Sequence, residues 1–285
     1  MSKFILSAFA DEIDPMLTKQ MDVLNRHGIK YIEMRGVNGK NLVEHTLEEA
    51  GEIKKQLDAR GFRISAVGSP IGKIKITDPF EPHLELFRHT VKIAQILETE
   101  YIRMFSFFIP QGEDPASFRD EVMKRWRAFI DTAEGTGLTL LHENEKGIYG
   151  DTAERCLDLL ETMNCSYLKA VFDPANFVQC NVKTYPEAYQ LLKGHVAYMH
   201  IKDALYADHS VVPSGYGDGR VKDILKELNS GGFEGFLSLE PHLADFKGFA
   251  GLEPGSPANR LPKDGPGQFA VAVEALLKIL NEMEG

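Results

Sequence analysis

Residues 138–241 contain four short apolar runs, which read LTLLHEN (138–144), LKAVFDP (168–174), VAYMHIK (196–202) and GFLSLEP (235–241). Each run is rich in strand-forming residues and ends in polar or turn-forming ones, which is typical of a buried strand. Longer segments with helical signals separate the runs. Strands that alternate with helices in this way indicate strand–helix–strand units, in which neighbouring strands are parallel. This part of the chain therefore predicts an α/β fold.

The same pattern extends toward the N-terminus, where four more runs come before these. They read FILSAFA (4–10), KYIEMRG (30–36), RISAVGS (63–69) and YIRMFSFF (101–108). Eight strands, each followed by a helix, in a chain of 285 residues predict a single-domain (β/α)8 TIM barrel over residues 1–285. The main alternative is a doubly wound open sheet. The segment FADEID (9–14), which follows the first strand, lacks the glycines of the phosphate-binding turn of that fold.

Two of the intervening segments carry clear helix signals. Residues 45–61 contain Thr46 and, three residues later, Glu49, which is the pattern of a capping box at a helix start. Residues 267–285 have a helical pattern up to the end of the chain and are predicted to form the closing helix.

Composition limits the classes of partner. The chain has 32 basic and 42 acidic residues, a formal net charge of −10, whereas proteins that bind nucleic acids usually present a basic surface. No apolar run reaches the ~18 residues that cross a bilayer. The first run is interrupted by Asp11 and Glu12 and is interpreted as a strand, not as a signal peptide. We therefore expect a cytoplasmic protein with no nucleic-acid or membrane partner, and we expect its three cysteines to be free thiols.

Side chains that can bind a metal stand at the ends of the last four predicted strands. In a (β/α)8 barrel the carboxyl ends of the strands form the mouth, where the chemistry takes place. Strand alternation puts His200 and Lys202 on the face opposite the apolar Ile201, so His200 is predicted to point into the barrel. The same alternation turns Glu240 inward. We call these four strand-end residues the quartet, which consists of Glu143, Asp173, His200 and Glu240.

The quartet predicts a divalent metal site. A single acidic residue at a strand end is more often a helix cap or half of an ion pair, but four such groups on adjacent strands converge at the mouth. Three carboxylates at close range repel one another unless they are protonated or neutralised by a cation. Three carboxylates and one imidazole suit Mn²⁺, Mg²⁺, Co²⁺ or Zn²⁺, and no cysteine belongs to the pattern. Of these four ions, we expect Mn²⁺.

The quartet and its surroundings resemble a known family. The segments HENEKG (142–147), FDPAN (172–176), HIKD (200–203) and SLEPH (238–242) are similar to the strand ends of the xylose isomerase-like TIM barrels. The resemblance extends over essentially the whole chain. This superfamily includes sugar-phosphate isomerases and epimerases, ketose 3-epimerases, hydroxypyruvate isomerase, inosose dehydratase, dehydroshikimate dehydratase and endonuclease IV.

The resemblance implies a metal-dependent sugar isomerase or epimerase that acts on a small carbohydrate or polyol-like carbonyl compound. In that branch the metal binds adjacent oxygens of a hydroxy-ketone, and two metal-bound glutamates transfer a proton. Carried over to this chain, Glu143 and Glu240 are both ligands and acid–base groups, while Asp173 and His200 are ligands. The chemistry is physically sound, because a metal that polarises a carbonyl acidifies the neighbouring C–H and stabilises the enediolate.

Three alternatives stay open. A dehydratase (lyase) that acts on an inosose- or dehydroshikimate-like compound begins with the same proton abstraction on the same metal site. A barrel that binds a metal and a ligand without catalysis is the second alternative. A nuclease similar to endonuclease IV is the least favoured, because its trinuclear zinc site needs more histidines at strand ends than this chain provides.

Four further residues are predicted to bind the substrate: Arg103, Asn176, Lys202 and His242. Lys202 either donates to a substrate oxygen or balances the charge of the carboxylates. Arg103 is a charged residue inside a barrel strand, so it lines the pocket or belongs to a buried ion pair. Asn176 stands where several family members have a histidine, and His242 follows the last strand at the mouth. These assignments place the substrate beside the quartet.

Two other buried polar residues are given structural roles. Glu33, within the second predicted strand, is interpreted as half of an ion pair, because a buried charge is costly without a partner. His142 comes directly before Glu143, so alternation points it toward the helices, where we expect a packed and hydrogen-bonded histidine.

Three long loops, 68–83, 204–220 and 242–267, are expected to shape specificity. Within the second, GYGDG (215–219) is either an anion-binding backbone turn or a plain turn in which Asp218 or a neighbour caps the next helix. The third loop is rich in glycine and proline and is interpreted as a lid or as a contact between subunits, which is compatible with a homo-oligomer.

Overall fold

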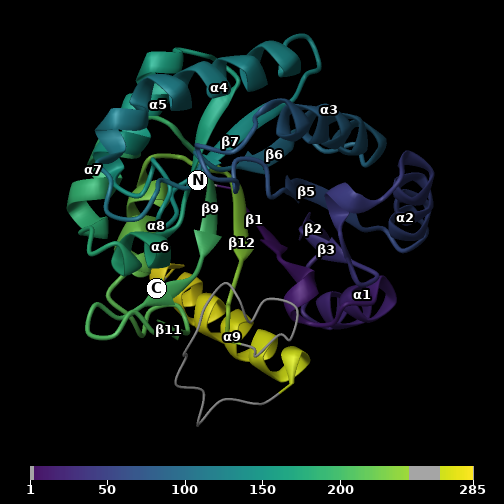
Figure 1. The fold of residues 1–285 in the computed structure, drawn as a ribbon. Coiled ribbons are helices and arrows are strands. Elements are labelled where there is room, and N and C mark those ends of the chain that lie inside the picture. The colour runs from purple at the N-terminus through teal and green to yellow at the C-terminus, as the bar shows by residue number, and fades with distance from the viewer. Residues whose placement is uncertain (1–2, 244–263, 285) are drawn as a thin grey trace.

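The computed structural model describes residues 3–243 and 264–284. Eight parallel strands form a nearly closed barrel, and helices surround it (Figure 1). The strands pair in the order β1-β12-β9-β8-β7-β6-β5-β2, and β1 lies beside β2 at the seam. Their bounds are β1 (Lys3–Ala8), β2 (Tyr31–Met34), β5 (Arg63–Gly68), β6 (Tyr101–Met104), β7 (Thr139–Glu143), β8 (Leu168–Phe172), β9 (Val196–Ile201) and β12 (Glu234–Leu239). The predicted single-domain barrel and all eight predicted strands are confirmed.

The helices follow the strands around the outside of the barrel (Figure 1). They are α1 (Leu17–Arg26), α2 (Leu47–Ala59), α3 (Glu81–Ile96), α4 (Arg119–Ala133), α5 (Ala153–Met163), α6 (Pro174–Gln179), α7 (Tyr189–Leu192), α8 (Val221–Ser230) and α9 (Gly265–Glu284). The predicted capping box starts α2, since the Thr46 hydroxyl accepts the Glu49 N–H at 3.1 Å and the Glu49 carboxylate accepts the Thr46 N–H at 2.8 Å. The closing helix α9 begins two residues before its predicted start.

Strand alternation divides the buried side chains into two hydrophobic cores. Met199 and Ile201 of β9 pack into the large core between the strands and the helices. Tyr198 lies on the other face of the strand, in a small core inside the barrel with Leu141 and Val171. His200 shares the inward face with Tyr198, as predicted, so the sequence pattern alone aims it at the barrel axis.

The loops at the carboxyl ends of the strands close over the barrel interior. Two short antiparallel hairpins belong to them, β3 (Gly36–Val37) with β4 (Lys40–Asn41) and β10 (Asp203–Ala204) with β11 (Val211–Val212). In the loop after β5, Gly72 has φ +89° and lies so close to the barrel that a Cβ would approach the Phe105 carbonyl oxygen to 2.0 Å. Only glycine fits there.

Most of the third predicted loop, 242–267, lies outside the described residues. The interpretation of that loop as a lid or subunit contact therefore also falls outside them.

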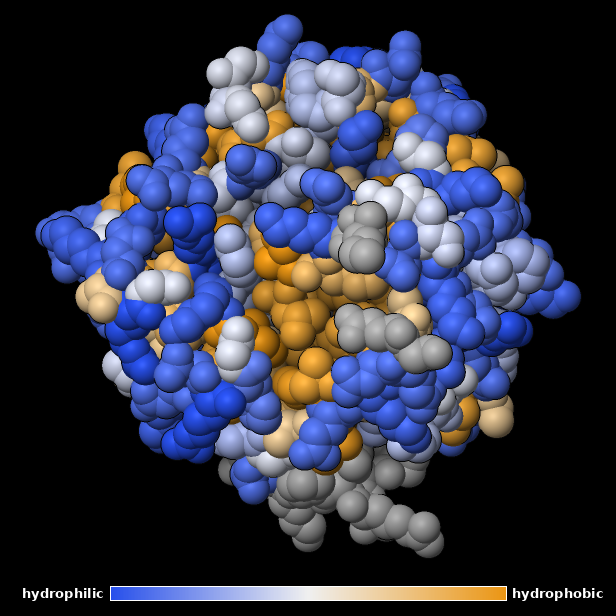
Figure 2. Space-filling model, turned by 180° about the vertical axis from the view of Figure 1, so that it is seen from behind, coloured by the Kyte–Doolittle hydropathy of each residue, from blue (hydrophilic) through white to orange (hydrophobic). Residues whose placement is uncertain are grey.

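In the part of the chain that the structure describes, no helix combines the length and the hydropathy needed to cross a membrane. On the face seen from behind, hydrophobic residues line a central hollow and hydrophilic residues surround it (Figure 2).

Candidate active site

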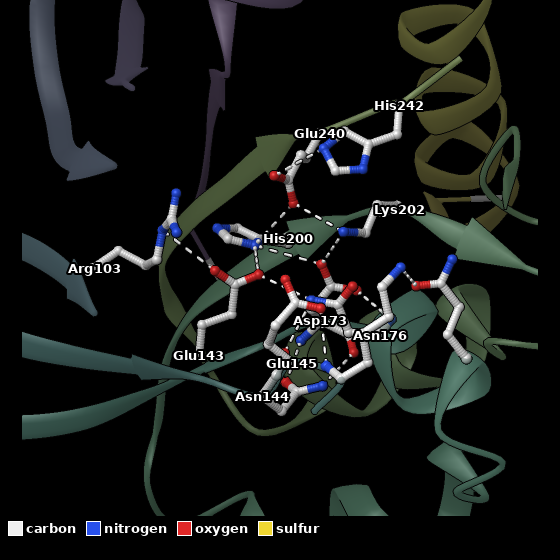
Figure 3. Close-up of polar contacts among 12 residues, drawn as sticks. Arg103, Glu143, Asn144, Glu145, Asp173, Asn176, His200, Lys202, Glu240 and His242 are labelled. Atoms are coloured by element: carbon white, nitrogen blue, oxygen red, sulfur yellow. Dashed lines mark hydrogen bonds and ion pairs between the residues drawn. The ribbon is translucent and has the colours of Figure 1, made fainter. Parts of the chain in front are cut away.

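The barrel brings the quartet together at the carboxyl ends of its last four strands (Figure 3). Glu143 is the last residue of β7, Asp173 directly follows β8, His200 lies in β9, and Glu240 directly follows β12. Each residue offers one ligand atom, and these four atoms all lie within 4.8 Å of one another. All four side chains are buried. The predicted convergence of the quartet is therefore present in the fold.

His200 is at the centre of this group. Its Nδ1 lies 3.0 Å from Glu143 Oε1, 3.5 Å from Asp173 Oδ2 and 3.4 Å from Glu240 Oε2. Its Nε2 faces the other way and lies 3.2 Å from Glu33 Oε2. The arrangement presents Nδ1 to the carboxylates of the quartet, while the Glu33 carboxylate fixes the opposite side of the ring.

Glu33 thus has a partner that the sequence did not reveal. Glu33 does form an ion pair, since Arg103 Nε lies 3.8 Å from Glu33 Oε1. The imidazole of His200 is nearer, with its Nε2 3.2 Å from Glu33 Oε2. Glu33 is fully buried on β2, and the neighbouring Ile32 and Met34 pack into the outer core. Alternation could have shown that Glu33 points inward, but its pairing with a residue on β9 depends on how the barrel closes.

Cationic side chains neutralise the carboxylates of the quartet. Lys202 Nζ lies 3.0 Å from Asp173 Oδ2 and 3.1 Å from Glu240 Oε2. Burial alone would lower the pKa of Lys202, but these two carboxylates raise it well above its usual value. Of the two roles predicted for Lys202, this geometry matches the second, in which the ammonium balances the charge of the carboxylates. Burial would likewise raise the pKa of Glu143, yet His200 and Arg103 lower it to about 2.

The donor set fits a divalent cation. Asp173 Oδ2 is buried and faces the other members of the quartet, with the Lys202 ammonium at 3.0 Å and His200 Nδ1 at 3.5 Å. Three carboxylates and one imidazole are the ligand types that Mn²⁺, Mg²⁺ and Zn²⁺ accept. The three cysteines are free and do not belong to the group. The quartet is therefore chemically suited to hold a metal ion.

A hydrogen-bond network behind the quartet holds two of its members. Asp173 Oδ1 accepts the N–H of Asn176 at 2.9 Å and so caps the start of α6. The amide of Asn176 donates to Glu143 Oε1 at 3.1 Å and to the Asn144 carbonyl at 2.9 Å. The Asn144 side chain in turn exchanges two hydrogen bonds with the backbone of Asp173. Asn176 therefore contacts Glu143 directly from behind.

A second acidic group adjoins the quartet and was not predicted. Glu12, Glu240 and His242 also offer ligand atoms within 4.8 Å of one another. Here an arginine supplies the positive charge, because Arg35 contacts Glu240 Oε1 at 3.0 Å, Glu12 Oε1 at 3.2 Å and Asp11 Oδ2 at 2.8 Å. The signal was the acidic segment FADEID (9–14), which sits at the carboxyl end of the first strand.

A cavity of about 310 Å³ opens beside the quartet and reaches Glu143 and Glu240. Of the four predicted substrate-binding residues, Arg103 and His242 line it. Lys202 and Asn176 are almost completely buried and are not among its described lining residues. The structure therefore brings all four residues to the quartet, but only two of them to the described wall of the cavity.

His142 points toward the helices, as predicted. Its Nε2 lies 3.0 Å from the Ser106 hydroxyl oxygen, and its ring packs edge-on against Trp126 at 5.6 Å. Burial lowers the pKa of His142 to about 4, so the ring is neutral at pH 7.

The glycine-rich turn in the second long loop binds an anion that belongs to the chain itself. The Asp203 carboxylate accepts N–H groups from three glycines of the turn, Gly215 at 2.8 Å, Gly217 at 3.1 Å and Gly219 at 2.8 Å. Asp218 accepts the N–H of Tyr206, and neither it nor the N-cap residue Arg220 forms a side-chain cap of α8, so the capping alternative is wrong. Because Asp203 directly follows Lys202, these hydrogen bonds fix the glycine-rich loop next to the quartet.

Three solved structures share this fold over nearly their whole length. The IOLI protein, solved with a bound zinc atom, has a TM-score of 0.74 at 16% identity, and 99% of each chain is covered. A D-tagatose 3-epimerase-like protein has a TM-score of 0.71 at 18% identity, with 98% of this chain and 99% of that chain covered. The probable 3-DHS dehydratase AsbF from Bacillus anthracis, involved in petrobactin synthesis, has a TM-score of 0.70 at 18% identity, with 97% and 99% covered.

The sequence comparison assigns the family. No curated protein matches the chain at a significant level. The family described as xylose isomerase-like TIM barrel matches residues 21–268, which include every member of the quartet. With the barrel, the quartet and the matched residues in agreement, this chain belongs to the xylose isomerase-like TIM barrel family.

Proposed function

We propose that this chain is a divalent-metal-dependent isomerase or epimerase that moves a proton next to the carbonyl of a small sugar-like substrate. The observation that carries the proposal is the position of Glu143 and Glu240. Both belong to the quartet and both line the cavity. They lie on opposite sides of His200 (Figure 3). Two carboxylates placed in this way can remove a proton from one face of a substrate and return it to the other.

The residues of the chain have separate tasks in this proposal. Asp173, His200 and the two glutamates hold the ion. When bound, a divalent metal polarises the substrate carbonyl and stabilises the negative charge that develops on its oxygen. Asn176 and Arg103 keep Glu143 oriented and ionised, the form that accepts a proton. Lys202 does the same for Glu240. We propose Mn²⁺ as the ion, because three carboxylates outnumber the single imidazole.

The solved structures share the fold, and what their descriptions state fits the proposal. One of them holds zinc and another is epimerase-like. A dehydratase is the second candidate, and one observation favours it. His242 lines the cavity beside Glu240, with its Nε2 3.2 Å from Glu240 Oε1. An imidazole in that place can protonate a departing hydroxyl after the proton abstraction that both reactions share.

The first test is the metal content of the protein. We expect about one Mn²⁺ per chain after loading and desalting, and we expect Asp173→Asn to lose it while its circular dichroism stays unchanged. The asparagine retains the Oδ1 that caps α6, so loss of metal reports on the ligand and not on the fold. Equal retention in both proteins, or no retention in either, would contradict the proposal.

The second test follows the proton. In D₂O, Mn²⁺-loaded protein is incubated with a panel of ketoses and sugar acids, and deuterium at the carbon next to the carbonyl is measured by NMR. We expect incorporation with at least one substrate, and we expect Glu143→Gln and Glu240→Gln to abolish it. A rise in ultraviolet absorbance from a conjugated product would instead identify a dehydratase. Metal retention without exchange or absorbance change would indicate a binding barrel.

A further inference from the structure

Two arginines line the cavity, and their surroundings differ. Arg35 is surrounded by carboxylates, and its three guanidinium nitrogens all contact Asp11, Glu12 or Glu240. Arg103 is also buried, with 4% of its side chain exposed against 10% for Arg35. Its nearest acidic atom is Glu143 Oε2, 3.2 Å from Nε, and no hydrogen bond forms there. Within residues 3–243 and 264–284, no protein group accepts a hydrogen bond from the Arg103 guanidinium.

The Arg103 guanidinium is held in one place. Its central carbon lies 4.5 Å from the centre of the Phe105 ring and 5.4 Å from that of Phe9. Gly68 leaves room for it, since a Cβ at that position would lie 3.3 Å from Arg103 Nη2 and 2.9 Å from the Phe9 ring. The Ser69 hydroxyl donates to the Arg103 carbonyl oxygen at 2.5 Å. The planar group is therefore oriented before any ligand arrives.

A buried guanidinium with free donors requires an acceptor. Leaving such donors unpaired in a protein interior costs free energy, whereas the oxygens of an oxyanion satisfy several of them at once through charge-assisted hydrogen bonds. A neutral hydroxyl satisfies one or two donors and forms weaker hydrogen bonds. A second cation of the same wall is Lys73, whose Nζ lies 4.2 Å from the centre of the Phe105 ring and 3.0 Å from Glu145. Two cations of the cavity wall therefore contact the Phe105 ring, and the charge of one of them, Lys73, is paired with Glu145.

We infer that the substrate of this cavity carries an oxyanion, a carboxylate or a phosphate ester, and that Arg103 binds it. The inference rests on the proposed function to place the substrate in the cavity. Arg103 holds the anionic end, and the carbonyl end lies toward the quartet, because Glu143 is shared by the quartet and by the Arg103 contact. The preferred substrates are then sugar acids or sugar phosphates, and neutral sugars bind more weakly.

The test uses ligands that differ in one group and lack the aldehyde or ketone carbonyl on which the proposed isomerisation depends. Binding of D-glucitol, D-gluconate and D-glucitol 6-phosphate is measured by calorimetry, once with Mn²⁺ and once with EDTA. We expect the wild type to bind gluconate or the phosphate about 10- to 100-fold more tightly than glucitol under both conditions, as charge-assisted hydrogen bonds require. Gluconate and the phosphate separate the two sources of the oxyanion.

Variants assign the preference to Arg103. We expect Arg103→Met to lose the preference, and Arg103→Lys to retain part of it, because lysine keeps the charge but not the planar donor pair. Lys75→Met is the control. It removes an exposed cation of the loop after β5, the loop that carries Lys73, and Lys75 does not line the described cavity wall, so we expect this variant to behave as wild type. Metal content is measured for each variant, because Arg103 contacts Glu143.

The outcomes separate this inference from the proposed function. If the wild type holds Mn²⁺ and exchanges deuterium into neutral ketoses but shows no oxyanion preference, the inference is wrong and the proposed function stands. An oxyanion preference that survives in folded Arg103→Met also overturns the inference. If oxyanions bind through Arg103 but no metal is retained, the inference stands and the proposed function fails.

Discussion

The two ends of the barrel interior are built from different chemistry. At the carboxyl end, the inward side chains are the quartet, Lys202, Glu33 and Arg103, all ionisable and nearly all without exposure to solvent. Further down, the inward side chains of Leu141, Val171 and Tyr198 form a small hydrophobic core. Between the two, the hydroxyls of Ser7, Ser65 and Tyr198 form a short hydrogen-bonded chain, 2.6 Å and 2.8 Å long at its two links.

This difference separates two sources of stability. Buried charges stabilise a fold only while each has a partner, and removing one partner leaves the other unpaired in a medium of low polarity. A hydrophobic core depends on burial and packing and responds to neither charge nor ions. The carboxyl end should therefore respond to a metal ion, and the inner core should not.

The largest effect is expected for Lys202→Met. Without metal, Asp173 and Glu240 lose the ammonium between them, and we expect the free energy of unfolding to fall by about 3–5 kcal/mol. With Mn²⁺ the loss should shrink, because the ion then neutralises the same carboxylates. Urea unfolding with EDTA and with Mn²⁺ measures both values. Equal losses under the two conditions would contradict this account of the mouth.

The matching change in the inner core is Leu141→Ala. This side chain is completely buried, and its truncation should cost about 2–5 kcal/mol through lost burial and the cavity that remains. The same urea titrations should give equal losses with and without Mn²⁺, and the metal content should match the wild type. A loss that depends on Mn²⁺ would show that the two ends of the barrel are coupled.

The third change is Glu33→Gln. Glu33 lies behind the quartet, and among the described ion pairs and hydrogen bonds His200 is its contact within the quartet. Replacing the carboxylate with an amide weakens the support of the imidazole, and we expect Mn²⁺ to bind about 10- to 100-fold more weakly. Glu52→Gln, at an exposed surface position, is the control. If Glu33 were only half of an ion pair with Arg103, the variant would change the melting temperature and leave the Mn²⁺ affinity as it is.

The smallest effect concerns the loop after β5 at the mouth. His83 Nε2 accepts the N–H of Gly72 at 2.7 Å, and burial together with the charge of Arg125 lowers the pKa of His83 from 6.5 to about 4. The unfolded chain takes up this proton below pH 6.5, so stability is complete above that pH and is lost as the pH falls toward 4. We expect a loss of about 2 kcal/mol at pH 5 relative to pH 7.

Thermal or urea unfolding at the two pH values measures this slope. His83→Gln should be less stable than wild type at pH 7 and should have a smaller slope. His209→Gln, which replaces an exposed histidine, should keep the wild-type slope. An unchanged slope in His83→Gln would show that other groups account for the pH dependence of stability.

Much of the site could be predicted because it depends on short-range rules. Alternation along a strand decides which side chains face the barrel axis, so His200 and Glu240 could be assigned inward and His142 outward from the sequence. The capping box at Thr46 and Glu49 is likewise a pattern within one turn of helix. The convergence of the quartet followed from a general property of barrels, whose strand ends meet at one mouth.

The pairings across the barrel could not be predicted in this way. Arg35 and Glu240 are far apart in the sequence and meet because β1, which pairs with β12, also lies beside β2 where the barrel closes. Glu33 reaches His200 across the interior, and Asp203, not an external anion, fills the glycine turn. Which of several available partners a charge takes is settled by distances of a few ångströms in a medium of low polarity.

The sequence by itself therefore determined the barrel, the inward direction of His200 and Glu240 and the identity of the quartet, because these depend on spacing along the chain. The tertiary structure decided which charges are satisfied within the protein and which are not. It pairs Arg35 completely and leaves the donors of Arg103 free toward the cavity, a difference between two buried arginines that only the closed barrel creates.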